Sequence, residues 1–354
     1  MAKKSVQLSG VVVAESAICS IDPDQGVLMY RGYDIAELAE RSTYEETALL
    51  LLDGDAPSAE ALDAFRAELS DQRDLPPETA EAVDRQAGAA APMDVLRTAV
   101  STLTAATPTQ LIARLPTIVS RYHRRRRGLE PVAPDPGLSY SENVLTMLRG
   151  ERPSEREARI FDIAMILHAE HELNASTFAA RVVAGTGADL TAAVVAAIAA
   201  LGGPLHGGAN EAAMSFFERA GSPDRAPDAV REALASGEKL HGLGHPLYRA
   251  YDPRALILKR LSQELSESAG EPNWYAITEA VERTAFEEKG LYPNVDLYSG
   301  SVYRYLGIPT DLFTPLFAAS RVVGWSAHVL EQQADNRIIR PSAEYVGEPR
   351  RPFP

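Results

Sequence analysis

The chain has 354 residues and a formal net charge of −14 at pH 7, from 35 basic and 49 acidic side chains. This acidic balance disfavours a nucleic-acid binder, which needs a basic face. Hydrophobic residues make up 45% of the sequence, enough for a full core, and the length favours two domains or a large lobe with a smaller one. The single cysteine, Cys19, excludes an intrachain disulfide framework. Because the N-terminus has no apolar signal core and no apolar stretch approaches the roughly 20 residues that span a bilayer, we expect a cytoplasmic protein that binds no membrane.

The first residues predict a small β-hairpin, and the rest of the chain predicts helices. Residues 10–18 and 27–30 are short and apolar or β-branched, and residues 22–26 between them have turn composition. Capping-box spacings at Ser42 and Thr43 predict the start of a helix that includes residues 48–52. Later apolar residues recur with the helical period. The predicted helices cover about residues 58–70, 77–87, 93–103, 108–122, 155–173, 190–201, 209–220, 226–235, 253–268, 273–288 and 311–333.

The fold class is therefore mainly α, because almost every periodic segment has the helical period. Residues 127–139 are rich in glycine and proline and predict a linker. A second lobe is predicted to begin at the glycine-rich loop 202–208 and to end near residues 307–309, where a glycine and a proline precede the last helix.

One histidine lies between two pairs of glycines, in the loop Gly-Gly-Pro-Leu-His-Gly-Gly from Gly202 to Gly208. Glycine permits positive φ and a close approach of the backbone to another group, and loops often carry function. His206 is therefore either held against a ligand or incidental to a tight corner between two helices. The loop alone leaves both interpretations open.

Two further histidines, His168 and His171, share a face near the end of a predicted helix in the sequence HAEHELN. With a neighbouring glutamate they could bind a metal, although the sequence lacks an HExxH motif and a cysteine cluster. Alternatively, they are satisfied polar residues at a helix end, or His171 points into a cleft and binds an anion.

A third loop carries His245 and is followed by Arg249 and Arg254. Arginine is always charged and its planar fork matches carboxylates and phosphates. A single arginine is most often a solvated surface charge. The clustering of two arginines with a loop histidine favours an anion site instead.

Asp296 is the one carboxylate in the stretch Tyr-Pro-Asn-Val-Asp-Leu-Tyr-Ser-Gly, and it could be a helix N-cap or a general base. Arg321 lies among apolar residues of the last long helix, so we expect it to be partly buried and to need an anionic partner. Arg340 follows that helix.

Two loop histidines, a carboxylate and several arginines suit proton abstraction next to a carbonyl followed by carbon–carbon bond formation. The sequence has no GxSxG, GxGxxG or Walker motif.

The motifs also resemble those of the citrate synthase family, of the short bacterial and archaeal type. The matching stretches occur in the family's order over nearly the whole chain: VVVAESAICSID, YRGYDI, HAEHELNAS, GGPLHGGANE, GLGHPLYRAYDPRA, YPNVDLYSG and NRIIRPSAEYVG. The resemblance implies a two-domain helical fold with a small N-terminal β-hairpin. Residues 1–207 with 310–354 would form a large, dimer-forming domain, and residues 208–309 a small CoA-binding domain that closes over the cleft.

The resemblance implies a catalytic role for three residues. Asp296 would remove a methyl proton from acetyl-CoA, His206 would stabilise the enol oxygen, and His245 would polarise the ketone of oxaloacetate during attack. The resulting citryl-CoA would then be hydrolysed to citrate and CoA.

The resemblance also implies the binding residues. Oxaloacetate would contact His171, Arg254, Arg321 and Arg340, and the family's counterpart of Arg340 reaches the site from the other subunit of a homodimer. Arg249 would contact CoA. No cofactor and no metal are implied.

Several interpretations stay open at this point. The basic run that includes Arg125 and Arg126 is either a solvated helix end or a further contact for the CoA phosphates. Pro246 replaces an arginine of many bacterial relatives.

A 2-methylcitrate synthase that uses propionyl-CoA would share every residue named above. One methylene typically changes selectivity by only ~1–3 kcal/mol, so these motifs do not separate the two activities. A non-catalytic dimer that binds an acidic metabolite is a second competing function, and a metal-dependent hydrolase that uses His168 and His171 is a third.

Overall fold

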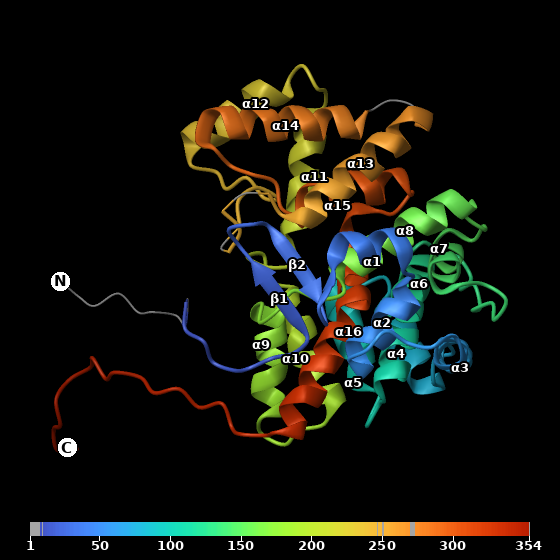
Figure 1. Cartoon of the computed structure of the whole chain (residues 1–354), viewed down its shortest axis with the longest axis vertical. Helices are drawn as coiled ribbons and strands as arrows, with labels where there is room; N and C mark the ends of the chain where they lie inside the picture. Colours follow the sequence, from blue (N-terminus) through green and yellow to red (C-terminus); the bar gives the residue numbers. More distant parts are fainter. Residues whose placement is uncertain (1–7, 9, 246, 250, 270–272, 354) are drawn as a thin grey trace.

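The computed structural model describes residues 8, 10–245, 247–249, 251–269 and 273–353. These residues form a mainly α-helical structure with a three-stranded antiparallel sheet near the N-terminus, which confirms the predicted fold class (Figure 1). None of the helices in this described part is long and apolar enough to cross a membrane.

The predicted hairpin exists, but the prediction placed its first strand too early. The strands are β1 (Cys19–Asp22), β2 (Val27–Tyr30) and a short β3 (Tyr33–Asp34), which the sequence pattern did not predict. The carboxylate of Asp22 accepts hydrogen bonds from the backbone of Asp24 and Gln25, so the chain turns directly after Asp22. A turn at this point pairs Asp22 with Val27 and leaves residues 11–16 outside the sheet.

The larger group of helices surrounds α16, whose residues are almost all buried. Thr43 caps α2 by accepting from the backbone of Glu46, as the capping-box spacing predicted. The irregular segment between α6 and α7 contains the predicted linker. The bounds of this group are α1 (Ile35–Arg41), α2 (Tyr44–Asp53), α3 (Ala59–Asp71), α4 (Pro77–Gln86), α5 (Pro92–Ser101), α6 (Pro108–Arg126), α7 (Tyr140–Arg149), α8 (Glu155–His168), α9 (Ala175–Ala184), α10 (Leu190–Leu201), the 3₁₀ turn η1 (Thr310–Leu312) and α16 (Phe313–Ala334).

The other helices gather at one end of the molecule, above the sheet in Figure 1. They are α11 (Ala209–Ala220), α12 (Ala226–Ser236), α13 (Pro253–Ser268), α14 (Trp274–Lys289) and α15 (Val295–Tyr305). They cover the part of the chain predicted as a small domain. The division at residues 207/208 and 309/310 into two moving domains stays a prediction.

One predicted helix was too long, because α8 ends at His168 rather than near residue 173. Glu172 has a positive φ of 53°, and Asn174 caps the next helix, α9, by accepting from the backbone of Thr177. The chain therefore turns between the two helices. Helices α7, α9 and α15 were not predicted at all, since each is short and lies next to loop-like sequence.

The turn after α8 packs tightly against α16. A Cβ atom at Gly324 would overlap the carboxylate of Glu170 and the carbonyl oxygen of Ala169. Glycine at this position therefore allows α16 to approach the segment that carries His171.

We predict that Gly324→Ala separates α16 from this segment and lowers the free energy of unfolding by about 1–3 kcal/mol, the usual cost of overpacking a core. Chemical denaturation measures the change. Gly88→Ala is the matched control, because a Cβ at Gly88 meets nothing within 4 Å. Equal stability of the two variants would contradict the prediction.

Candidate active site

Side chains from both groups of helices meet at the boundary between the two groups, and this meeting place is called the cleft. His171 follows α8, and His245 lies in the loop after α12. Their rings are 5.2 Å apart, centroid to centroid, in an edge-to-face arrangement. Arg254 begins α13 and Asp296 begins α15. The charges of Arg254 and Arg321 both act to lower the pKa of Asp296, so the three side chains lie in the same neighbourhood. The structure thus brings together residues that are far apart in sequence.

His206 reaches this neighbourhood from the loop between α10 and α11. Its Nε2 lies 2.9 Å from the hydroxyl of Ser176 and accepts the backbone N–H of Ser176 at 3.3 Å. Because a backbone N–H can only donate, Nε2 carries no proton, and the proton of the neutral ring is on Nδ1. Gly207 follows directly, and a Cβ there would overlap Leu201, so the loop needs glycine to hold this shape.

His245 has the opposite tautomer. Its Nδ1 accepts the backbone N–H groups of Leu247 at 3.0 Å and of Tyr248 at 3.3 Å. The proton of the neutral ring is therefore on Nε2. Each loop thus fixes which nitrogen of its histidine can donate a hydrogen bond.

All three cleft histidines are held in the neutral form. Burial, helped by the charge of Arg321, lowers the pKa of His206 to about 4. Burial and the charge of Arg254 lower the pKa of His245 to about 4 and that of His171 well below its ordinary value. Removal of an imidazole from water disfavours its charged form, so these rings act as neutral donors near pH 7.

Asp296 is the candidate base, and it is not an N-cap. The cap of α15 is Asn294, whose side chain accepts the backbone N–H of Asp296 at 2.9 Å. Burial raises the pKa of the Asp296 carboxyl to about 7, against the opposing charge of Arg254. The group can therefore take up and release a proton near neutral pH.

Two buried arginines give the cleft its positive charge. Arg254 is 2% exposed, and Asp252 binds it through two hydrogen bonds of 3.0 and 2.7 Å. Arg321 is 1% exposed, donates from Nε to the carbonyl of His168, and lies over the ring of Phe317. Among the described residues no carboxylate forms an ion pair with Arg321. The charge of Glu170 acts on Arg321 without a direct ion pair, so a bound anion can supply the direct anionic partner predicted for it.

Three residues that hold the site had no predicted role. Ser176 contacts His206, and the indole N–H of Trp325 donates to the Ser176 hydroxyl at 3.1 Å. Asp252 also accepts the backbone N–H of Val295, so it joins the starts of α13 and α15. Only the DPR sequence at residues 252–254 hinted at this, because an aspartate two residues before an arginine can cap a helix and pair with it.

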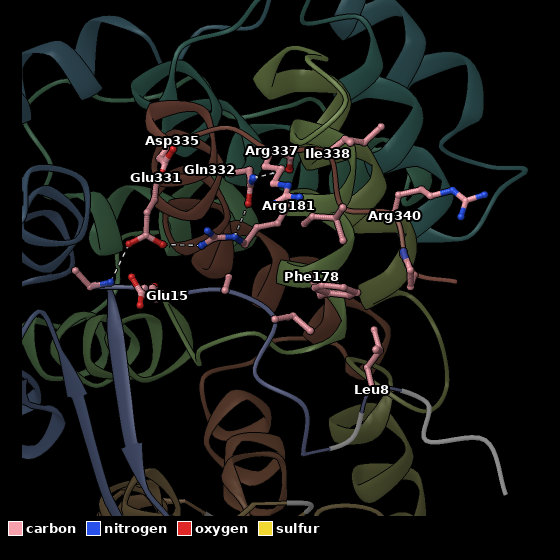
Figure 2. A pocket seen from close by; sticks show the side chains of 16 residues that line it. Leu8, Glu15, Phe178, Arg181, Glu331, Gln332, Asp335, Arg337, Ile338 and Arg340 are labelled. Carbon is pink, nitrogen blue, oxygen red and sulfur yellow. Dashed lines mark hydrogen bonds and ion pairs between the residues drawn. The ribbon is translucent and has the colours of Figure 1, made fainter. Parts of the chain in front are cut away.

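Arg249 and Arg340 are not brought into the cleft. Arg249 is exposed and pairs with Asp24 on the hairpin turn at 2.9 Å. Arg340 lies in the extended, exposed segment after α16 and lines a cavity of about 840 Å³ between that segment and the N-terminal segment. Figure 2 shows its side chain directed away from Glu331 and Arg181, which pair deeper in the cavity. Pro246 lies outside the described residues.

Arg125 and Arg126 lie in the last turn of α6 and have local partners. Arg125 pairs with Asp84 and with Glu130 at 3.3 and 3.0 Å, and Arg126 pairs with Asp311. These ion pairs favour the interpretation as a surface helix end, while the proposed contact with CoA stays a prediction.

The side chains that could act as metal ligands do not suit a cation. In the described residues the group that could hold an ion is His171, His245 and Asp252, whose ligand atoms lie within 4.8 Å of one another, and it does not include His168. Both oxygens of Asp252 already accept hydrogen bonds from Arg254, and the nearby guanidinium repels a cation. The Nδ1 of His168 donates to the carbonyl of Ala164 at 2.7 Å.

Comparisons with known proteins agree with one another. Residues 7–342 match the family model for the citrate synthase C-terminal domain. The chain is 46% identical to a citrate synthase of Haloferax volcanii, over 96% of this chain and 95% of the relative. It is 40% identical to a 2-methylcitrate synthase of Shewanella oneidensis, over 98% of this chain and 96% of the relative. A crystal structure of citrate synthase from Pyrobaculum aerophilum is 41% identical with a TM-score of 0.91 and covers 98% of this chain and 93% of its own. A ternary complex of the Thermoplasma acidophilum enzyme with carboxymethyl coenzyme A and oxaloacetate is 32% identical with a TM-score of 0.93, over 99% and 98%.

We predict that neither His206 nor His245 titrates between about pH 5 and pH 8, where an ordinary histidine does. Their ring-proton NMR signals should move only near pH 4, since burial lowers both pKa values. His206→Gln and His245→Gln assign the signals. A midpoint near the ordinary histidine pKa for either ring would show that the cleft is more hydrated than the structure indicates.

Proposed function

The chain belongs to the citrate synthase family, and we propose that this cleft condenses acetyl-CoA with oxaloacetate and water to give citrate and CoA. The observation that carries the assignment of roles is the set of two neutral histidines with opposite tautomers beside a carboxyl group whose pKa is about 7. Two donors and one base are what an enolisation followed by attack on a ketone requires.

In the first step Asp296 takes a proton from the thioester methyl group. A thioester methyl is a very weak carbon acid, so the base needs help from a donor at the carbonyl oxygen. The Nδ1–H of His206 supplies that donor, because its Nε2 is occupied by Ser176. A hydrogen bond that strengthens as the oxygen gains charge lowers the barrier selectively.

In the second step the enol carbon attacks the ketone of oxaloacetate. The Nε2–H of His245 donates to the ketone oxygen, because Nδ1 of the same ring is occupied by two backbone amides. Water then hydrolyses the citryl thioester. We propose that neither a metal nor a cofactor takes part, so exhaustive chelation should leave the rate unchanged.

Oxaloacetate binding uses the buried positive charge. Asp252 compensates Arg254, so Arg321 is the cation of this cleft that lacks an ion-pair partner among the described residues. A substrate with two carboxylates needs more positive charge than that. We propose that His171 adds a hydrogen bond and that Arg340 of a second subunit adds the missing charge.

Both chain ends support a homodimer. Val12 is 89% exposed and Phe353 is 97% exposed, and other apolar side chains of the two terminal segments, including Ile338 and Val346, also face solvent. Exposed apolar side chains on extended segments favour cover by a partner. Arg340 lies in one of these segments (Figure 2). We propose a cytoplasmic homodimer in which each subunit completes the other's cleft.

Arg249 is proposed to contact CoA. To do so it leaves Asp24, which costs little because both side chains of that ion pair are exposed. Arg125 and Arg126 remain candidates for the CoA phosphates. Their replacement by alanine would raise the acetyl-CoA KM alone if they have this role.

The acyl group is the open choice within the family, because a relative 40% identical over nearly the whole chain is a 2-methylcitrate synthase. We propose acetyl-CoA as the preferred substrate. Steady-state release of free thiol with oxaloacetate, measured for acetyl-CoA and propionyl-CoA, should give the higher kcat/KM for acetyl-CoA. A preference for propionyl-CoA would reverse the assignment.

We predict that kcat/KM for acetyl-CoA falls about tenfold per pH unit below pH 7, because the base works only when deprotonated. The pKa of about 7 for Asp296 sets the midpoint. Asp296→Asn should lower kcat by about 10²–10⁴ and abolish this acid limb. Asp94→Asn, which removes a surface carboxylate of α5 paired with Arg97, should leave both unchanged. Citrate formation within a few fold of wild type in Asp296→Asn would contradict the mechanism and favour a non-catalytic binding protein.

We predict that inactive subunits complement each other across the dimer. When Arg340→Ala and Asp296→Asn subunits are unfolded and refolded together, one cleft of each mixed dimer has both residues, so about a quarter of the wild-type activity should return. Asp296→Asn with Arg254→Ala is the control, because both residues belong to the same cleft and no mixed dimer is complete. No recovery in the test pair would show that Arg340 serves its own subunit, and recovery in the control would show that Asp296 and Arg254 do not belong to the same subunit's cleft.

A further inference from the structure

Tyr248 is a buried side chain of the cleft to which no role has been given so far. It is 6% exposed, and its ring contacts the rings of His245 and His171 at centroid distances of 4.7 and 5.7 Å. Its hydroxyl lies 3.2 Å from Nε2 of His171. Three aromatic rings therefore contact one another where the oxaloacetate site is proposed.

The direction of the hydrogen bond between Tyr248 and His171 follows from the available partners. Among the residues that the structure describes, Nε2 of His171 is the partner given to the Tyr248 hydroxyl. A buried phenolic proton left without an acceptor is costly, so the hydroxyl donates. The His171 ring can accept, because burial and the charge of Arg254 keep it neutral.

This arrangement repeats what the other two cleft histidines show. Backbone amides occupy Nε2 of His206 and Nδ1 of His245, and each ring keeps its proton on the free nitrogen. In His171 the occupying donor is a side chain rather than the backbone. With Nε2 occupied, the proton of the neutral His171 ring is on Nδ1.

The tautomer matters for an anionic ligand. Oxaloacetate offers only acceptor oxygens, two carboxylates and a ketone, so a nitrogen lone pair facing it would repel it and leave an acceptor unpaired. A donor that fixes the tautomer beforehand removes this unfavourable state from the free enzyme.

We propose that Tyr248 is a positioning residue that donates to Nε2 of His171 and so keeps the His171 proton on Nδ1 for oxaloacetate. The inference rests on the proposed function, in which His171 binds this substrate. Tyr248 itself touches no reacting atom, so its removal should affect oxaloacetate binding and not the chemical step.

The test is Tyr248→Phe, which keeps the ring packed on His245 and removes only the hydroxyl. The oxaloacetate KM should rise about threefold to tenfold, the usual worth of one hydrogen bond, while kcat and the acetyl-CoA KM stay unchanged. Tyr251→Phe is the matched control: it lies three residues further along the same loop, and its hydroxyl bonds Glu282 instead of a histidine. In a His171→Gln background Tyr248→Phe should have no further effect. An unchanged or lower oxaloacetate KM, or an equal loss in kcat, would overturn the proposal.

A second measurement determines the tautomer of His171 directly and needs no binding assay. The ¹⁵N NMR shifts of His171 in the unliganded wild-type protein, assigned with His171→Gln, should show the proton on Nδ1, and in Tyr248→Phe they should show a mixture of tautomers. A proton on Nε2 in the wild type would overturn the proposal. If the wild-type protein made no citrate or methylcitrate from any acyl-CoA, the proposed function would fail, but this tautomer result would stand separately.

Discussion

An imidazole that is taken out of water loses its charged form before anything else, and the cleft depends on that loss. Burial lowers the pKa of His206 and of His245 to about 4, so both rings are neutral donors with a single proton. Backbone amides then decide where the proton resides, on Nδ1 of His206 and on Nε2 of His245. The same dehydration raises the pKa of Asp296 to about 7. Desolvation thus produces both the two directed donors and the base. In a cleft open to water the histidines and the aspartate would keep their ordinary pKa values.

Holding cations in a largely desolvated site requires specific partners. Asp252 binds Arg254 through two hydrogen bonds and also holds the start of α15, so the arginine and the base are fixed together. Arg321 has a backbone carbonyl and the Phe317 ring instead of a carboxylate. A buried cation without an ion-pair partner is unfavourable by itself, and a bound dianion offsets that cost. The substrate therefore completes the electrostatics of the site, with the further charge that we propose from the second subunit.

The sequence predicted those parts of the site whose signals are local, and it missed those that depend on tertiary contacts. His206 and His245 lie in glycine-marked loops, and the helical period gave most helices within a few residues. The tautomers could not be predicted, because Ser176 is 30 positions from His206, and Tyr248 is 77 positions from His171. Asp296 remained ambiguous until Asn294 was seen to cap α15. Similarly, α8 ends early because Glu172 turns the chain with a positive φ, which no periodicity reveals.

The central claim is that the backbone fixes opposite tautomers in two neutral histidines. The most direct test is the ¹⁵N NMR spectrum of histidine-labelled protein at neutral pH, with signals assigned by His206→Gln and His245→Gln. We expect a protonated Nδ1 in His206 and a protonated Nε2 in His245. The same tautomer in both rings, or an imidazolium in either, would contradict the claim.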